Sequence, residues 1–165
     1  DMRFYKVYLV YKGLYRLKKR KHSMKKYLFT TRMEVRDYEC DIEGIVNNAN
    51  YLHYTEHTRH RFINSLGISY AKLHEEKHVD PVVARMNLKF KAPLHCDDVM
   101  LSCVNVRKEG LRYIFTHDIY READNQLCFH GDVELVMLIN GKLGNSEDYD
   151  NAFLPVIEKF NKENA

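Results

Sequence analysis

Residues 49–66 read ANYLHYTEHTRHRFINSL and predict one long helix. Bulky residues recur near helical spacing from Tyr51 to Leu66, and few sides of this helix are purely polar. Asn47 or Asn48 is a suitable N-cap, and Gly67 is a suitable C-cap. We therefore expect a helix that other elements of the domain enclose on several sides.

The segments on either side of this helix predict strands. Residues 27–36 are rich in β-formers. After a second, short helical stretch at 69–77, apolar residues alternate from Val82 to Phe90, which predicts a strand with one apolar face. Three more strands are predicted over 99–107, 111–121 and 126–139, and an amphipathic helix over 153–160.

The order of these elements predicts the fold class. Strands joined by short hairpins form an antiparallel sheet, and a lone long helix has to bury its apolar surface on that sheet. The sequence therefore predicts an α+β domain in which one antiparallel sheet wraps around one central helix. The three prolines, at positions 81, 93 and 155, are expected at element boundaries, where a missing N–H does least harm.

Charge divides the chain into two parts. Residues 1–26 hold ten Lys or Arg and one acid, whereas residues 27–165 hold 16 basic and 22 acidic residues. We interpret 1–26 as a basic extension before a natural start at Met24, not as a signal peptide, and 27–165 as the domain. Without a recognised binding motif, the charge does not predict a nucleic-acid partner.

Composition predicts a soluble, cytoplasmic protein. No apolar run approaches the roughly 18 residues of a membrane-spanning helix. The four cysteines form no C-x-x-C pair, which excludes a zinc ribbon or thioredoxin motif and is typical of a reducing compartment. Cys103 and Cys128 lie in predicted strands and are expected in the core.

Residues 37–57 read DYECDIEGIVNNANYLHYTEH and carry a motif. An acid at Asp41 is followed by a Gly-Ile-Val turn at 44–46, a small residue at Ala49 and an aromatic residue at Tyr51. This pattern resembles the 4-hydroxybenzoyl-CoA thioesterase branch of the hot-dog superfamily. The resemblance extends over about residues 27–140, with further matches at Phe90, Pro93 and Asp97.

The resemblance implies a hot-dog fold and an acyl-CoA thioesterase. Asp41 would be the nucleophile or the general base. The N–H near Asn48, at the positive end of the helix, would stabilise the oxyanion. Glu56 would orient water, or it is a surface acid paired with Arg59 or His60. The resemblance also implies a homodimer or homotetramer with active sites between subunits, in which residues near 86–91 of the other copy form the facing wall.

Substrate-binding residues are predicted in two places. Val46, Asn47 and Tyr51, near the start of the helix, would bind the substrate, and Tyr51, Tyr54 and Phe62 would shape the acyl pocket. Exposed cations would bind the phosphates of coenzyme A. One group of candidates shares a strand face: Arg85, Lys89 and Lys91. The other flanks a hairpin: Arg107, Lys108 and Arg112. A surface exposed to solvent explains the charges of both groups equally well.

Three alternatives stay open. The Val46-Asn47-Asn48 run is also similar to plant acyl-ACP thioesterases, but their catalytic Asn and His would fall at Glu43 and Ile45, which do not match. The second alternative is a non-catalytic acyl-binding domain. The third is a zinc peptidase, because residues 53–57 match H-x-x-E-H. The preferred interpretation requires no metal or other cofactor, and water is the co-substrate.

Overall fold

The computed structural model describes residues 26–164, so the predicted basic extension lies outside the described residues apart from Lys26. Six strands form one antiparallel sheet with the order β1-β3-β4-β5-β2, and β6 pairs with β5. Their bounds are Phe29–Glu34 for β1, Val79–Phe90 for β2, Val99–Glu109 for β3, Arg112–Arg121 for β4, Gln126–Ile139 for β5 and Lys142–Gly144 for β6.

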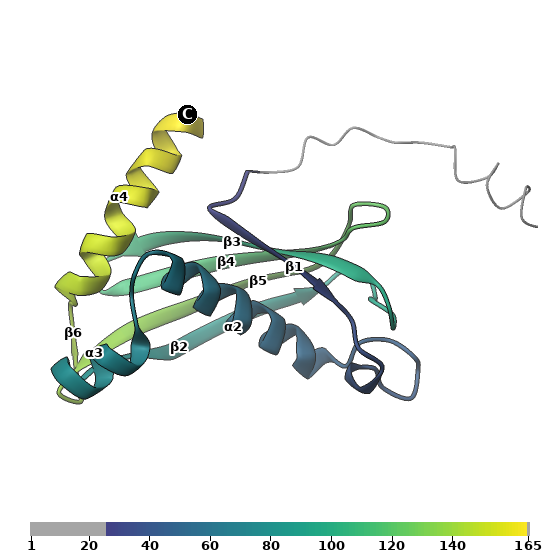
Figure 1. Cartoon of the computed structure of the whole chain (residues 1–165), viewed down its shortest axis with the longest axis horizontal. Coiled ribbons are helices and arrows are strands. Elements are labelled where there is room, and N and C mark those ends of the chain that lie inside the picture. The colour runs from purple at the N-terminus through teal and green to yellow at the C-terminus, as the bar shows by residue number, and fades with distance from the viewer. Residues whose placement is uncertain (1–25, 165) are drawn as a thin grey trace, which may run out of the picture.

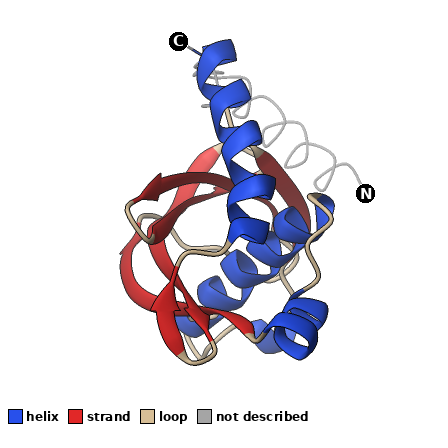
Figure 2. Ribbon diagram, turned by 90° about the vertical axis from the view of Figure 1, so that its left-hand side faces the viewer, coloured by secondary structure: helices blue, strands red, loops and turns tan. Residues whose placement is uncertain are grey.

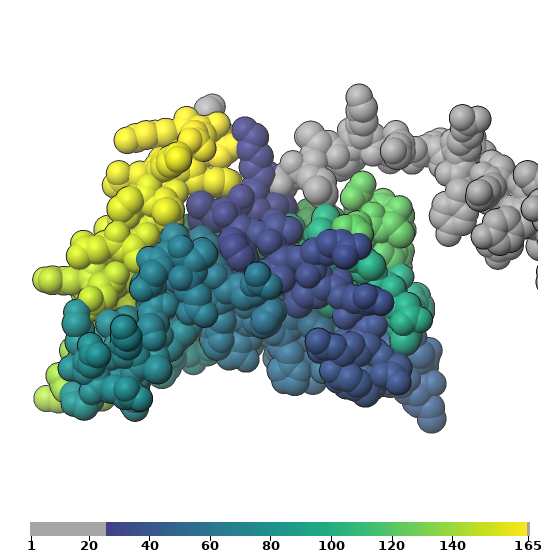
Figure 3. All heavy atoms as spheres, viewed as in Figure 1, coloured from purple at the N-terminus to yellow at the C-terminus, as the bar shows by residue number. Residues whose placement is uncertain are grey.

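The predicted central helix is confirmed as α2, Asn48–Ser65, and Asn47 is its N-cap, because the Asn47 side chain accepts a hydrogen bond from the Ala49 N–H. The sheet curls around α2, which lies on its concave face, and β1 forms one edge of the sheet (Figures 1 and 2). In the space-filling view, the atoms of β1 lie beside those of α2 (Figure 3). The other helices are α3, Tyr70–Lys77, and α4, Glu147–Asn164, and a short 3-10 helix spans Asp37–Glu39. This is the α+β architecture predicted from the sequence.

The core between α2 and the sheet consists of two apolar clusters. One lies under the first half of α2 and includes Tyr51, Tyr54 and Phe129. The other lies under its second half and includes Phe62 and Phe153, so α4 contributes to it. The first cluster therefore supports the start of α2, where the predicted catalytic residues lie.

Two proline positions differ from the prediction. Pro81 lies inside β2, which tolerates it because β2 is an edge strand with β5 as its single neighbour. Pro155 lies in the middle of α4, whereas the helix predicted over 153–160 placed it in the first turn. Its side of α4 is exposed, so water can satisfy the carbonyl group that its missing N–H leaves without a partner.

The predicted apolar face of β2 is only partly buried. A register shift interrupts the β2–β5 ladder between Val83 and Arg85, and residues 83–87 are all exposed. Met86 and Phe90 keep 41% and 52% of their surface exposed. Sheet edges that face solvent usually carry charged side chains, so exposed apolar side chains on an edge strand are unusual.

His117 is a fully buried titratable residue in β4, and neither of its ring nitrogens has a hydrogen-bond partner among the described residues. Burial, and then the nearby charge of Arg59, lower the pKa of His117 to about 3. In the unfolded chain the His117 ring takes up a proton near pH 6.5, whereas in the folded chain it stays neutral until the pH is much lower. Stability from this group is complete above that pH and is lost as the pH falls toward 3.

We expect the free energy of unfolding to fall below pH 6.5 with a slope that approaches about 1.4 kcal/mol per pH unit from His117 alone. Urea unfolding between pH 4.5 and 8 measures this slope. In His117→Leu the slope should be smaller by that amount, since the titrating group is gone. Equal slopes in both proteins would contradict the assignment.

Two further sequence predictions concern the core and the membrane. All four cysteines are free thiols, and Cys103 and Cys128 are buried as predicted. Among the described residues, no helix combines the length and the apolar character needed to cross a bilayer.

Candidate functional site

The loop before α2 carries Asp41 and is closed by its own hydrogen bonds. Cys40 and Val46 form an antiparallel bridge, and the Asp41 N–H donates to the Ile45 carbonyl at 2.9 Å. Gly44 takes a φ of 74° at the tip, a conformation that glycine adopts without strain. The loop is therefore a small fixed turn that ends where α2 begins.

The main-chain N–H of Asn48 is available as a donor at this end of α2. The N–H of Asn47 is used by the Glu39 carbonyl at 2.9 Å, and that of Ala49 by the Asn47 side chain at 3.0 Å. Among the described residues, no hydrogen bond involves the Asn48 N–H. An unpaired N–H at a helix N-terminus is the donor that an oxyanion needs.

The Asp41 carboxylate is partly exposed, and its Oδ1 accepts a hydrogen bond from the Glu43 N–H at 3.1 Å. This contact stabilises the turn, which is the ordinary role of an Asp at such a position. It leaves the second carboxylate oxygen without a hydrogen bond from a described residue. The geometry therefore accommodates both a structural and a chemical role.

Glu39 is a residue of this region that the sequence did not single out. It is 8% exposed, and its carboxylate accepts hydrogen bonds from the Tyr54 hydroxyl at 2.8 Å and the Arg36 N–H at 2.8 Å. The Arg36 guanidinium lies 3.6 Å away. Burial, and then the hydrogen bond to Glu39, raise the pKa of Tyr54.

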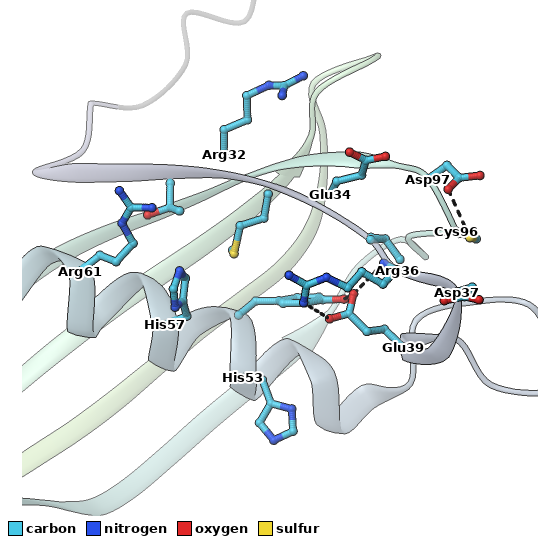
Figure 4. Close-up of a pocket in the computed structure, with 14 residues that line it drawn as sticks. Arg32, Glu34, Arg36, Asp37, Glu39, His53, His57, Arg61, Cys96 and Asp97 are labelled. Carbon is cyan, nitrogen blue, oxygen red and sulfur yellow. Dashed lines mark hydrogen bonds and ion pairs between the residues drawn. The ribbon is translucent and has the colours of Figure 1, made fainter.

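A groove of about 940 Å³ runs between α2 and β1. His57 and Arg61 point from α2 toward β1, whereas Arg32 and Glu34 point away from α2 (Figure 4). Asp97, with a left-handed φ of 65°, lies at the end of the groove near the loop. None of the residues predicted for catalysis or substrate binding lines this groove, whereas Tyr54, predicted to shape the acyl pocket, does, as does Glu39.

Two predicted substrate-binding residues, Val46 and Tyr51, are buried in the core near the start of α2. Val46 is buried, and its N–H donates to the Leu94 carbonyl at 2.8 Å. Tyr51 is 4% exposed, and its hydroxyl accepts a hydrogen bond from the Leu94 N–H at 3.3 Å. Its ring lies 5.4 Å from that of Phe90, which brings the end of β2 against the first turns of α2 within one chain.

The two predicted groups of cations differ in their contacts. Lys89 and Lys91 are exposed, flank Phe90 and form no ion pair with a described residue. Arg85 lies 3.9 Å from Glu134. The hairpin cations are all paired with acids: Arg107 with Glu109, Lys108 with Asp150 and Arg112 with Glu134.

Glu56 and the helix histidines do not converge. Glu56 is exposed and lies 3.8 Å from His60, whose ring packs 4.7 Å from that of Tyr70. His53 and His57 line the groove instead. Within residues 26–164, no three His, Cys, Asp or Glu side chains come together in an arrangement that would hold a metal ion.

Comparison with known proteins identifies the family. The model of the thioesterase-like superfamily matches residues 35–154, most of the chain. The chain belongs to the thioesterase-like superfamily. The match includes the loop that carries Asp41, all of α2 and the five strands that follow β1. The hot-dog fold implied by the motif at 41–51 is therefore confirmed.

One relative is named for a substrate attached to acyl carrier protein. The chain is 35% identical over 92 residues to a chloroplastic acyl-acyl carrier protein thioesterase of Arabidopsis thaliana, a match that covers 54% of this chain and 47% of the relative. It therefore spans about half the length of that relative.

Two crystal structures share the fold. A 1,4-dihydroxy-2-naphthoyl-CoA thioesterase from Synechocystis has a TM-score of 0.72 and 17% identity, covering 81% of this chain and 97% of that one. A Thermus thermophilus thioesterase complexed with coenzyme A and Zn has a TM-score of 0.69 and 25% identity, covering 82% and 98%.

Proposed function

We propose that this protein hydrolyses an acyl-CoA thioester to the free acid and coenzyme A. The observation that carries the proposal is the unpaired Asn48 N–H at the start of α2, next to the fixed loop that holds Asp41. The N–H and the helix dipole stabilise the negative charge on the thioester oxygen as the carbonyl is attacked.

Asp41 supplies the second half of the reaction by one of two routes. As a nucleophile, its carboxylate bonds to the acyl carbon while the C–S bond breaks, and water then hydrolyses the mixed anhydride. As a general base, it takes a proton from the water that attacks the same carbon. In both routes the departing thiolate takes up a proton, and no cofactor is required.

Lys89 and Lys91 are the proposed contacts for the coenzyme A phosphates. Both side chains are exposed and form no ion pair with a described residue, and they flank Phe90, whose ring packs on Tyr51.

Acyl-ACP is the alternative substrate, supported by the Arabidopsis relative. A panel of acyl-CoA and acyl-ACP thioesters with free-thiol detection tests the proposal. We expect faster thiol release from acyl-CoA. Release from acyl-ACP alone would make ACP the carrier, and acyl binding without thiol release would make the domain non-catalytic.

We also propose that two copies pair through β2. This strand has one neighbour, and its free edge exposes Val83, Met86 and Phe90, which favours pairing with another strand. Because Phe90 packs on Tyr51, such pairing would bring the partner beside the start of α2. The copies would then form one continuous sheet, and two such dimers would form a tetramer.

We expect Met86→Glu to convert the assembly to monomers, because pairing at this edge would bury an unpaired carboxylate. Light scattering coupled to size-exclusion chromatography measures the mass. Leu154→Glu is the matched control, since Leu154 is 36% exposed on α4, which is not part of the sheet, and the assembly of this variant should not change. A monomeric wild type, or a Met86→Glu protein with the wild-type mass, would contradict the proposal.

A further inference from the structure

Glu39 ties the Asp41 loop to the start of α2 through both its main chain and its side chain. Its carbonyl accepts hydrogen bonds from the Asn47 N–H at 2.9 Å and from the Asn50 amide nitrogen at 2.7 Å. Its carboxylate accepts one from the Tyr54 hydroxyl at 2.8 Å. The three donors span the N-cap and the first two turns of α2.

The loop itself does not provide these connections. The Cys40–Val46 bridge and the hydrogen bond from Asp41 to Ile45 hold the turn at 40–46 together. They fix Asp41 relative to its own turn. The orientation of that turn against the axis of α2 depends on contacts across the two elements, and Glu39 lies at the base of the turn, where such contacts act.

The carboxylate of Glu39 is held on both of its oxygens. Its Oε2 accepts hydrogen bonds from the Tyr54 hydroxyl and the Arg36 N–H, and its Oε1 lies 3.6 Å from the Arg36 guanidinium. With the side chain buried in these contacts, the carboxylate is not free to reach a substrate carbonyl. Glu39 therefore acts through the loop and not on the substrate.

We propose that Glu39 is a positioning residue for thioester hydrolysis, holding Asp41 in register with the Asn48 N–H through its contacts with Tyr54 and the N-cap of α2. This inference rests on the proposed function. A misplacement of about 1 Å at a reacting group lowers a rate by up to about 100-fold, so loosening this contact should slow the chemical step. Substrate binding should change little, because Glu39 does not touch the reacting atoms.

The test compares Glu39→Met, Tyr54→Phe and the double variant in acyl-CoA hydrolysis. Glu39→Met keeps an unbranched side chain of similar length but has no oxygen to accept the Tyr54 hydrogen bond, and Tyr54→Phe removes the same hydrogen bond from the other side. We expect each to lower kcat about 10-fold with KM within about 2-fold of wild type. Because both break one contact, the double variant should lose no more than the worse single variant.

Two readouts separate positioning from other roles. The pH dependence of kcat should be the same in every variant as in the wild type, because Glu39 exchanges no proton with the substrate. A changed pH dependence in Glu39→Met would make Glu39 itself the acid or base. Lower thermal stability with an unchanged kcat would reduce Glu39 to a structural residue. Either result would overturn the proposal.

Glu43→Gln is the control, since Glu43 is an exposed acid in the same loop whose side chain forms no hydrogen bond or ion pair with a described residue. Its kcat and KM should equal those of the wild type. The proposed function fails separately: it requires wild-type turnover and a strong effect of Asp41→Asn. If both are observed while Glu39→Met and Tyr54→Phe remain fully active, only the positioning role is wrong.

Discussion

Asp41→Asn is expected to lower kcat for acyl-CoA hydrolysis at least ~100-fold, the size of effect that follows from losing a general base or nucleophile. That factor corresponds to about 2.7 kcal/mol of transition-state stabilisation. KM should change little, because the carboxylate acts on the reacting carbon rather than on the body of the substrate. Free-thiol detection on wild type and variant at equal folded concentration measures the loss.

Asparagine is the informative substitution at this position. Its side-chain oxygen can still accept the hydrogen bond that the Glu43 N–H donates to Asp41, and asparagine is well suited to turns. The fold of the loop should therefore survive. If Asp41 only stabilises the turn, Asp41→Asn should retain nearly full activity, and that result would remove it from the mechanism.

The control for Asp41→Asn is again Glu43→Gln. This substitution removes a carboxylate from the same loop, and the Glu43 side chain forms no hydrogen bond or ion pair with a described residue. Both variants reduce the negative charge of the loop by one unit. A loss of activity specific to position 41 therefore reports chemistry rather than local charge. Equal losses in the two variants would point to the electrostatic field of the loop instead.

Local sequence patterns were sufficient to predict most of the fold. Residues 126–139 alternate in burial, and the predicted strand coincides with β5. Asn47 marked the start of α2 because its side chain satisfies a helix N–H, a property of the residue itself. Hydrophobic periodicity and helix capping depend on residues close together in the sequence, so both can be recognised from a single sequence.

The elements that were missed depend on tertiary context. β6 is three residues long and exists through its pairing with β5, so it leaves no period to recognise. Pro155 suggested a boundary because proline is unfavourable inside helices, yet α4 starts at Glu147 and continues past it. The exposed edge of β2 could not be inferred from its apolar alternation, since alternation does not show whether a neighbouring strand is present.

The candidate site divides in the same way. Asp41 and Asn48 were found because the motif is contiguous and the start of a helix has known chemistry. Glu39 belongs to the same contiguous stretch, but its role depends on Tyr54, 15 residues away, and only the packed loop shows that contact. The groove between α2 and β1 collects residues from three distant segments, so no local pattern predicted it.

Phe153→Ala is expected to destabilise the domain by about 3–5 kcal/mol, the cost of a large cavity in an aromatic core. Phe153 is fully buried, and its ring lies 5.1 Å from that of Tyr113, 5.7 Å from Phe115 and 6.1 Å from Phe62. Urea unfolding followed by circular dichroism measures the change.

The loss at Phe153 bears on how α4 belongs to the domain. The superfamily match ends at residue 154, whereas α4 continues to Asn164, so the match alone leaves the second half of α4 outside the domain. Its inner face nevertheless supplies the ring that joins α2 to the sheet. Leu154→Ala is the control on the outer face, 36% exposed, and should cost no more than about 0.5 kcal/mol. A comparably small loss at Phe153, or separate melting of α4 with the sheet intact, would show that the core closes without this helix.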